Sequence, residues 1–307
     1  MKTLRQIIGE NMEGKTAVGH FNFSTFDVAQ AIVNAAKSLN VPVILGLSEG
    51  ERDFVGFTEA VAWVKSENQD LDNLRNKYTE ENNQEELNKI NNVKIFLNAD
   101  HTYSFIRVAE AVEAGFDMVI FDDAGGDLEK NIVEAKKCRD FIDEYNKKYG
   151  KDILLEAELG YIGKSSKVLT ELPDGLQKTS PEIAKKFVDE VKPDLLAPAV
   201  GNVHGMLKDV PDPNLDEKLC GEIFQTVNIP LVLHGASGNT KEDIQSCIKN
   251  GVVVVHVNTE IRVAYKEALK KYVTESDEVA PYKYIKEVEE AVQKTVEEKL
   301  KIFGFVE

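Results

Sequence analysis

The sequence predicts a (β/α)₈ barrel, a closed ring of eight parallel strands in which helices follow the strands. Three observations support this fold class. The 307 residues are enough for one such barrel, which usually needs about 250 residues, plus some additions. Eight short apolar runs recur along the chain, with amphipathic helical patterns between and after them. These runs are almost continuously apolar, as is typical of parallel strands that are buried on both faces.

The expected elements alternate along the chain. Strands are expected at Ala17–Phe23, Val43–Leu47, Ile95–Ala99, Met118–Phe121, Ile153–Leu159, Leu195–Ala199, Ile229–Leu233 and Val252–Val257. Helices are expected at Val28–Ser38, Phe105–Ala114, Glu129–Lys148, Pro181–Val191, Lys241–Asn250 and Ile261–Val273. An open, doubly wound sheet is the alternative, but no Gly-x-Gly-x-x-Gly sequence follows the first strand.

Two stretches fall outside this alternation. Lys65–Asn92 is highly charged and rich in Asn, Gln and Glu, which indicates a helical insertion on the surface. Tyr284–Phe303 has the pattern of a long amphipathic helix, which favours a C-terminal tail that packs on the barrel or contacts another subunit. No fixed repeat or low-complexity linker divides the chain, so one domain is expected over residues 1–307.

The composition restricts the partners and the compartment. A net charge of −16 argues against nucleic acid. The acidic surface serves solubility, and an anionic substrate would need a local positive site. Cys138, Cys220 and Cys247 are widely spaced and form no metal-binding pattern, which indicates buried reduced thiols. No apolar signal region precedes Thr16 and no apolar run reaches membrane length, so a cytoplasmic protein without a membrane partner is expected.

The five histidines of the chain all lie within or shortly after a predicted strand. They are His20, His101, His204, His234 and His256. Residues at the carboxyl ends of barrel strands converge on one mouth. A single histidine in such a place is usually structural, but three histidines and an open position are a common catalytic metal arrangement.

The sequences around three histidines suggest that an anion binds nearby. Small residues follow His234 in LVLHGASG, where backbone amides can approach a phosphate. Gly205 follows His204, and Lys208 comes four residues after it. The segment Val257–Glu260 opens the helix after the last strand, and its amides can also hold a phosphate.

In their order along the chain, these motifs resemble those of the class II fructose-bisphosphate and tagatose-bisphosphate aldolases. The resemblance covers nearly the whole chain except Lys65–Asn92. It is carried by AVGHFNFS, LGLSEGERDF, NADH, EAGFDMVIFDDA, LEAELGYIG, PAVGNVHGMLK, LVLHGASGN, VVHVNTEIR and EEKLKIFG. It implies a barrel that binds Zn²⁺ or another divalent metal, with room for a monovalent cation, in a homodimer or homotetramer.

The resemblance also implies roles for individual residues. His101, His204 and His234 match the metal ligands, and Glu158 with Asp122 matches an alternative metal site. Asp100 matches the acid/base that serves the C4 oxygen of the substrate. The positions implied to contact substrate or phosphate are Asn22, Ser48, Gly205, Lys208, Gly235, Ser237, Asn258, Thr259 and, for the far phosphate, often across a subunit contact, Arg262.

The chain departs from the family pattern at several places. The loop after LEAELGYIG reads KSSKVLTE and lacks the usual proton-transfer acid, so Glu171 is the nearest acid that this loop offers. His256 stands where the family has Asn, and His20 stands in a Gly-His pair where Pro-Ala is common. Strands one and eight are neighbours in a closed barrel, so these two rings are expected to lie close together. They either fill the barrel or change substrate recognition and proton transfer.

The implied activity is reversible, metal-dependent cleavage of a ketose bisphosphate. Fructose 1,6-bisphosphate is the first candidate substrate, with dihydroxyacetone phosphate and glyceraldehyde 3-phosphate as products. Cleavage of tagatose bisphosphate or another phosphorylated ketose is an alternative. The absence of the usual acid from KSSKVLTE leaves a third possibility, a sugar-phosphate-binding homologue with impaired catalysis.

Overall fold

The computed structural model, which describes residues 2–163, 167–208 and 212–304, contains a closed barrel of parallel strands. The strands follow one another around the barrel in the order β1-β10-β9-β7-β5-β4-β3-β2. Their bounds are β1 (Val18–Asn22), β2 (Val43–Leu47), β3 (Ile95–Thr102), β4 (Met118–Phe121), β5 (Leu154–Leu159), β7 (Leu195–Pro198), β9 (Leu231–Leu233) and β10 (Val252–Val257). Each predicted strand is present, with ends that differ by up to three residues, so the predicted fold class is confirmed.

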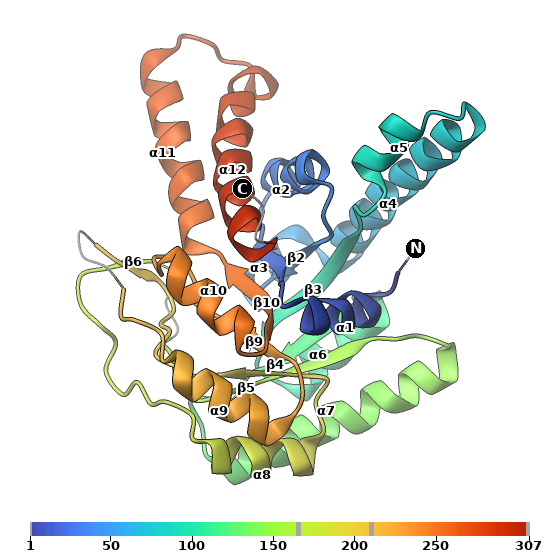
Figure 1. Ribbon diagram of the computed structural model, residues 1–307. Coiled ribbons are helices and arrows are strands. Elements are labelled where there is room, and N and C mark those ends of the chain that lie inside the picture. The colour runs from blue at the N-terminus through green and yellow to red at the C-terminus, as the bar shows by residue number, and fades with distance from the viewer. Residues whose placement is uncertain (1, 164–166, 209–211, 305–307) are drawn as a thin grey trace.

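Helices surround the barrel (Figure 1). Their bounds are α1 (Leu4–Gly14), α2 (Phe26–Leu39), α3 (Glu49–Val55), α4 (Phe57–Glu80), α5 (Gln84–Ile90), α6 (Phe105–Ala114), α7 (Leu128–Tyr149), α8 (Pro181–Val191), α9 (Glu217–Val227), α10 (Lys241–Lys249), α11 (Thr259–Glu275) and α12 (Pro281–Gly304). The charged stretch 65–92 forms most of α4 and α5, which project from the barrel as a hairpin. The predicted tail helix corresponds to α12, which lies beside α11 and α2. Within the described ranges, no helix is both long and apolar enough to cross a membrane.

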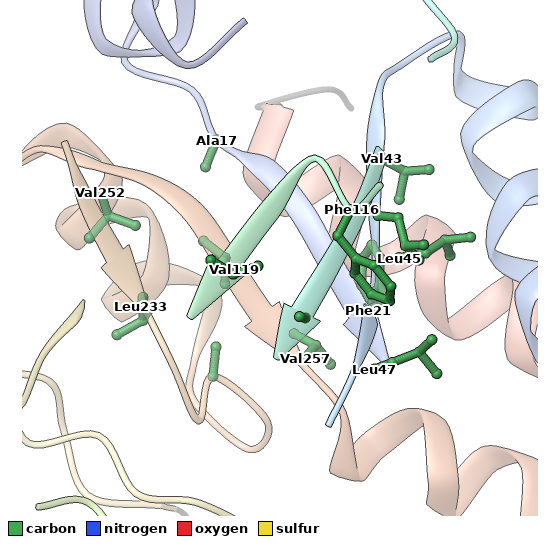
Figure 2. Close-up of a cluster of buried hydrophobic side chains, with 14 of the residues drawn as sticks. Ala17, Phe21, Val43, Leu45, Leu47, Phe116, Val119, Leu233, Val252 and Val257 are labelled. Carbon is green, nitrogen blue, oxygen red and sulfur yellow. The ribbon is translucent and has the colours of Figure 1, made fainter. Parts of the chain in front are cut away.

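Two apolar layers hold the barrel together. The outer layer lies between strands and helices and includes Phe21, Leu45 and Val257 (Figure 2). The inner layer closes the amino-terminal end of the barrel, where Leu4 and Ile8 of α1 pack against apolar side chains from the strands. The helix α1 was not predicted from the sequence, although Thr3 and Gln6 form a capping box at its start.

The inward-facing side chains change from apolar to polar along the strands. On β5, Leu154 belongs to the inner apolar layer, whereas Glu156 and Glu158 contact His234 farther along the barrel. Leu155 and Ala157 face the helices because side chains alternate along a strand. The same change occurs along β1 (Val18, His20, Asn22), β3 (Phe96, Asn98, Asp100) and β10 (Val254, His256). The carboxyl-terminal half of the barrel therefore has a polar interior.

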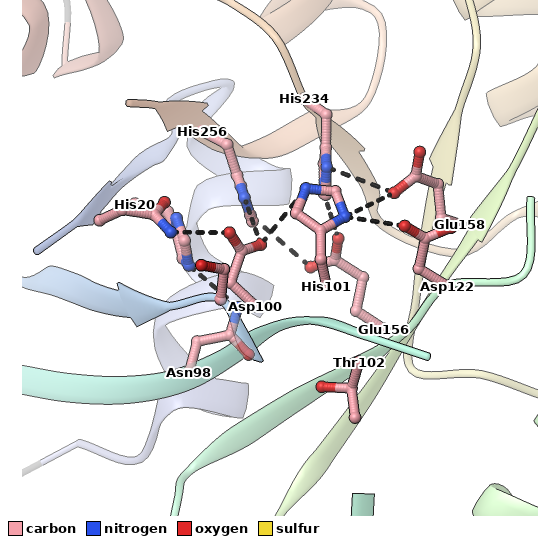
Figure 3. Close-up of polar contacts among 12 residues, drawn as sticks. His20, Asn98, Asp100, His101, Thr102, Asp122, Glu156, Glu158, His234 and His256 are labelled. Atoms are coloured by element: carbon pink, nitrogen blue, oxygen red, sulfur yellow. Dashed lines mark hydrogen bonds and ion pairs between the residues drawn. The ribbon is translucent and has the colours of Figure 1, made fainter. Parts of the chain in front are cut away.

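The alternation is broken at the end of β3. The pairing of β3 with β4 shifts register between Ala99 and Thr102, and His101 adopts a left-handed backbone conformation with φ of 38°. This conformation is unfavourable for a residue with a Cβ. The bulge allows the consecutive side chains of Asp100 and His101 to point into the same polar interior, as Figure 3 shows.

The buried guanidinium of Arg52 stabilises this bulge. Its Nη1 atom donates to the carbonyl oxygens of Leu47, at 2.5 Å, and of Asp100, at 2.9 Å. Its Nη2 atom donates to Thr102 Oγ1 at 3.0 Å. Burial lowers the pKa of Arg52 to about 10, so the group still carries its charge at neutral pH. Arg52 thus connects the end of β2 to both sides of the bulge.

A small parallel sheet joins two loops at the mouth of the barrel. It pairs β6 (Val168–Leu169), after β5, with β8 (Met206–Leu207), after β7. In addition, His204 N donates to Ile162 O at 2.8 Å. The loop that carries KSSKVLTE is therefore tied to the segment that carries His204, although Lys164–Ser166 lie outside the described residues.

We predict that Arg52→Met lowers the free energy of unfolding by about 2–5 kcal/mol, because each buried acceptor that loses its partner costs about 1–3 kcal/mol. Denaturant unfolding of the metal-free protein measures this change. Arg107→Met is a matched control, because Arg107 lies over the same Phe57 ring but is paired near the surface. The control should lose less than about 1 kcal/mol. Equal losses in the two variants would contradict the role of Arg52.

Candidate active site

The carboxyl ends of the barrel strands surround a cavity of about 270 Å³. Four of the five histidines line this cavity, and His20 does not. The lining residues are Asn22, Ser48, Glu49, Gly50, Asp100, His101, Tyr103, Asp122, Gly163, His204, Gly205, His234, Gly235, Ser237, His256, Asn258, Thr259 and Arg262. The structure therefore brings together residues that are separated by as many as 240 positions in the chain.

Three histidines and one carboxylate form a compact group at the base of the cavity. His101, His204, His234 and Glu158 each offer one ligand atom, and these atoms all lie within 4.8 Å of one another. The Oε2 atom of Glu158 is 3.3 Å from His101 Nδ1 and 3.6 Å from His234 Nδ1 (Figure 3). On the other side, Asp122 Oδ2 lies 2.9 Å from His101 Nδ1. The residues come from four different strand ends, which positions them rigidly around one point.

The unpaired atoms of this group fit a cation. His204 Nε2, His234 Nδ1 and Glu158 Oε2 are buried without a hydrogen-bond partner in the described structure. Buried polar atoms without partners are costly unless a ligand satisfies them. Imidazole nitrogens combined with a carboxylate oxygen suit Zn²⁺ and other divalent transition-metal ions. The donor set therefore fits a divalent metal ion, and Asp122 lies beside this group through its contact with His101.

Buried Glu156, which was not predicted as a site residue, contacts the ring of His234. His234 Nε2 lies 2.7 Å from Glu156 Oε1. Burial raises the pKa of Glu156, although the neighbouring His234 opposes the shift. A proton on Nε2 leaves Nδ1 of His234 free to bind a metal. The period of two along LLEAEL was the available signal, because it places Glu156 on the same face as Glu158.

Asp100 lies beside the histidine group and faces the cavity. Burial alone would raise the pKa of Asp100, but the positive charge of His101 and the nearby His256 ring hold it well below its usual range. Asn22 Nδ2 donates to Asp100 Oδ2 at 2.8 Å, whereas Oδ1 has no hydrogen-bond partner among the described residues. Asp100 is thus an ionised carboxylate with one oxygen available to a ligand.

The rings of His20 and His256 lie close together, as expected from the neighbouring strands. Their centroids are 3.5 Å apart and their planes differ by 9°. His256 also stacks on His234, at 4.1 Å. Burial lowers the pKa of His20 to about 4. Burial also lowers the pKa of His256 well below 6.5, and a positive charge on His20 or His234 would lower it further. Both rings are therefore neutral at pH 7.

Only one ring of this pair reaches the cavity. His256 lines it, whereas His20 lies deeper and Asn98 is 3.0 Å from its Nε2 atom. Gly46 makes room for the deeper ring, since a Cβ there would lie 2.2 Å from the His20 ring. His20 therefore supports His256, and only His256 can touch a ligand in the cavity.

The predicted phosphate-contacting residues are mostly brought together. Gly205, Gly235, Ser237, Asn258 and Thr259 all line the cavity. Gly235 has φ of 58°, and a Cβ there would lie 2.2 Å from Val203 O, so the position requires glycine. The helix α11 begins at Thr259, which lines the cavity, so the positive end of the helix dipole lies beside the cavity. This side of the mouth can bind an anion without a lysine.

Two predicted residues lie elsewhere. Lys208 is exposed and does not line the cavity, because its backbone is paired with Leu169 in the small sheet. Glu171, the nearest acid in the loop, is also exposed and away from the lining residues. By contrast, Asn22, Ser48 and Arg262, which were also predicted to contact substrate, line the cavity.

Comparisons with known proteins identify the family of this chain. The family model of class II fructose-bisphosphate aldolase matches residues 2–307. The fructose-bisphosphate aldolase of Staphylococcus aureus strain Mu50 is 32% identical over 304 residues, covering 98% of this chain and 96% of the relative. A probable fructose-bisphosphate aldolase of Bacillus subtilis strain 168 is 33% identical over 305 residues, covering 98% and 97% of the two chains.

Solved structures show the same fold. The YdjI aldolase from Escherichia coli K12 superimposes with a TM-score of 0.73 at 25% identity, covering 99% of this chain and 98% of that one. A putative fructose-1,6-bisphosphate aldolase from Coccidioides immitis gives a TM-score of 0.75 at 22% identity, covering 98% and 95%. Together with the family match over residues 2–307, the barrel and its histidine group show that this chain belongs to the class II fructose-bisphosphate aldolase family.

Proposed function

We propose that this protein catalyses the reversible aldol cleavage of a ketose bisphosphate, with fructose 1,6-bisphosphate as the first candidate substrate. The products would be dihydroxyacetone phosphate and glyceraldehyde 3-phosphate. The observation that carries the proposal is the group of His101, His204, His234 and Glu158, whose ligand atoms lie within 4.8 Å of one another beside Asp100. The family match over residues 2–307 supports the same reaction class.

In this proposal, His101, His204 and His234 hold a divalent ion, with Zn²⁺ as the first candidate, and Glu158 with Asp122 offers an alternative position. A bound divalent ion supplies Lewis-acid stabilisation of the negative charge that develops on the ketose fragment. The second carboxylate, Glu156, keeps His234 in the required tautomer through its 2.7 Å contact with Nε2.

Asp100 acts as the base during cleavage and as the acid in the reverse direction. Its low pKa keeps the carboxylate ionised, and its free Oδ1 can accept the proton of the C4 hydroxyl. As that proton leaves, C4 becomes the aldehyde carbon and the C3–C4 bond breaks. The electron pair remains on the ketose fragment, which takes a proton from water at C3 and becomes dihydroxyacetone phosphate, while Asp100 returns its proton to water.

The substrate is held by its two ends. Backbone amides at Gly205, Gly235 and the start of α11 bind the phosphate of the ketose fragment, with Ser237 and Asn258 beside them. Asn22, Ser48 and Arg262 face the other end. Local amides and one guanidinium thus attract a doubly phosphorylated substrate to a chain with a net charge of −16.

A sugar-phosphate-binding homologue with impaired catalysis is the second candidate. The exposed position of Glu171 favours it, because the described structure offers no acid from this loop to the cavity. Tagatose bisphosphate and other phosphorylated ketoses remain alternative substrates for the first candidate.

We also propose a homo-oligomeric assembly, a cytoplasmic location and a single domain. A homodimer or homotetramer is supported by exposed apolar side chains on and between α11 and α12, namely Val273, Val279 and Tyr282. A cytoplasmic location is supported by three buried, unpaired cysteines. One domain over residues 1–307 is supported by α12, which returns to pack on the barrel through Val292 and Phe303.

We predict that the purified protein cleaves fructose bisphosphate, tagatose bisphosphate or both, and that a chelator abolishes the activity. A coupled assay for the triose products measures cleavage with each substrate before and after chelation. Restoration by added Zn²⁺ or another divalent ion is the control. Full activity after removal of all bound metal would contradict the metal-dependent reaction, and binding without cleavage would favour the second candidate.

We predict that Asp100→Ala retains metal but loses about 10²–10⁴-fold in turnover, because a positioned acid/base contributes about that factor. His204→Ala is the contrasting variant and should lose both metal and activity, because it removes a ligand atom. Metal analysis and the coupled assay are applied to both variants. Near-normal turnover of Asp100→Ala, or tightly bound metal in His204→Ala, would refute the corresponding assignment.

We predict that His256→Asn changes the ratio of kcat/KM for fructose and tagatose bisphosphates by about 2–10-fold, because it exchanges hydrogen-bonding groups worth about 0.5–1.5 kcal/mol at the cavity wall. Metal content should stay unchanged. His20→Ala should shift the same ratio in a similar way, since the His20 ring supports His256. An unchanged ratio in both variants would show that the two rings only fill the barrel.

A further inference from the structure

Glu51 lies immediately behind the cavity wall and is buried. Its Oε2 atom accepts hydrogen bonds from Ser48 N at 2.9 Å, Ser48 Oγ at 2.8 Å and Asn22 Nδ2 at 2.9 Å. Its Oε1 atom accepts from Arg262 Nη2 at 2.6 Å. The side chain is only 7% exposed. Both oxygens of a buried carboxylate are therefore used, which positions Glu51 firmly.

Asn22 connects Glu51 to Asp100. The Nδ2 atom of Asn22 is 2.9 Å from Glu51 and 2.8 Å from Asp100 Oδ2, so its two N–H groups are shared between two carboxylates. The opposite orientation of this amide would direct its oxygen at both negative charges. The orientation of Asn22 is thus determined by the two carboxylates together, and a displacement of Glu51 would be transmitted to Asp100.

Arg262 is the other end of this chain of contacts. Of the described residues that line the cavity, it is the only lysine or arginine. Its side chain is 43% exposed, although one of its nitrogens is bound to Glu51. A guanidinium has five N–H groups in a planar fork, so Arg262 can hold Glu51 and an oxyanion at the same time.

We propose that Glu51 is a positioning residue that couples recognition of the aldehyde-side phosphate by Arg262 to the orientation of Asp100. The inference rests on the proposed aldolase function. A phosphate bound at Arg262 takes part of the positive charge that otherwise faces Glu51. The hydrogen bond from Asn22 to Glu51 then changes in strength. Because Asn22 also donates to Asp100, the orientation of Asp100 changes with it. Asp100 is correctly oriented when the aldehyde-side phosphate is bound at Arg262. The contact between Glu51 and Arg262 therefore contributes to specificity for phosphorylated aldehydes.

A double-mutant cycle tests the coupling. The variants are Glu51→Gln, Arg262→Met and the double variant, and the matched control is Asp53→Asn. Asp53 lies on the same helix α3 but pairs with Arg107 outside the cavity. For each variant, kcat and KM are measured for condensation of dihydroxyacetone phosphate with glyceraldehyde 3-phosphate and with unphosphorylated glyceraldehyde.

We expect Glu51→Gln to lower kcat/KM for the phosphorylated aldehyde by about 10–100-fold, because hydrogen bonds to the charged carboxylate of Glu51 are lost. The effect on unphosphorylated glyceraldehyde should be smaller, and part of the loss should appear in kcat. The double variant should be no worse than the weaker single variant, because the two residues act as one unit. Glu51→Asp, which keeps the charge, should recover part of the lost activity, and Asp53→Asn should behave like the wild type.

Deuterium exchange into dihydroxyacetone phosphate in D₂O distinguishes a failure of the proposed aldolase function from a failure of the coupling through Glu51. This exchange does not need the C4 oxygen, so Glu51→Gln should retain it, together with its metal content. If the wild-type enzyme shows no exchange, the proposed function itself fails. If it exchanges normally but the losses of Glu51→Gln and Arg262→Met multiply independently, or both aldehydes are affected equally, the coupling is refuted.

A second cycle avoids any dependence on how well Glu51→Gln folds. It combines Arg262→Met with Asp100→Asn and leaves Glu51 intact. Non-additive effects on kcat/KM for the phosphorylated aldehyde would support coupling between these two residues, which are connected in the described structure by the hydrogen bonds of Glu51 and Asn22. Additive effects would refute it.

Discussion

The buried charges inside the barrel must compensate one another, and much of this structure depends on that constraint. An isolated charge in a protein interior is strongly destabilised, so it must be paired, neutralised or bound to an ion. Here carboxylates alternate with imidazoles: Asp100 lies near His256, Glu156 bonds His234, and Glu158 faces His101. The opposite pKa shifts of Asp100 and His101 result from the same pairing. Three of the buried atoms that remain unpaired, His204 Nε2, His234 Nδ1 and Glu158 Oε2, belong to the residues that could hold a metal.

The parallel barrel can satisfy this constraint because its side chains alternate along each strand. Apolar residues fill the amino-terminal half of the interior, where α1 closes the barrel, and polar residues follow two or four positions later at the mouth. An exception, the bulge at His101, places two consecutive functional side chains in the same interior. Arg52 makes this exception stable by bonding the backbone on both sides. Stability and the geometry of the site therefore depend on the same contacts.

The acidic character of the chain restricts which groups at the cavity can bind a phosphate. With a net charge of −16, the surface repels phosphorylated compounds at long range. In the proposed function, binding relies on short-range groups that line the cavity, such as the backbone amides at Gly235, the start of α11 and the guanidinium of Arg262. Lys208 was expected among them, but its backbone pairs in the small sheet and its side chain faces solvent. Amides need no counter-ion, which suits a site already crowded with carboxylates.

The sequence by itself determined the barrel, the family and the convergence of three histidines, because these depend on local patterns. Apolar runs mark strands, and histidines at their ends must converge once the barrel closes, as His101, His204 and His234 do. It did not reveal Glu156, Glu51 or Arg52. Their roles arise from partners that are distant in the chain, such as His234 for Glu156 and Arg262 for Glu51. Only the tertiary structure decided these pairings, and it also placed Lys208 and Glu171 outside the cavity, because loop positions depend on packing between segments and not on local sequence.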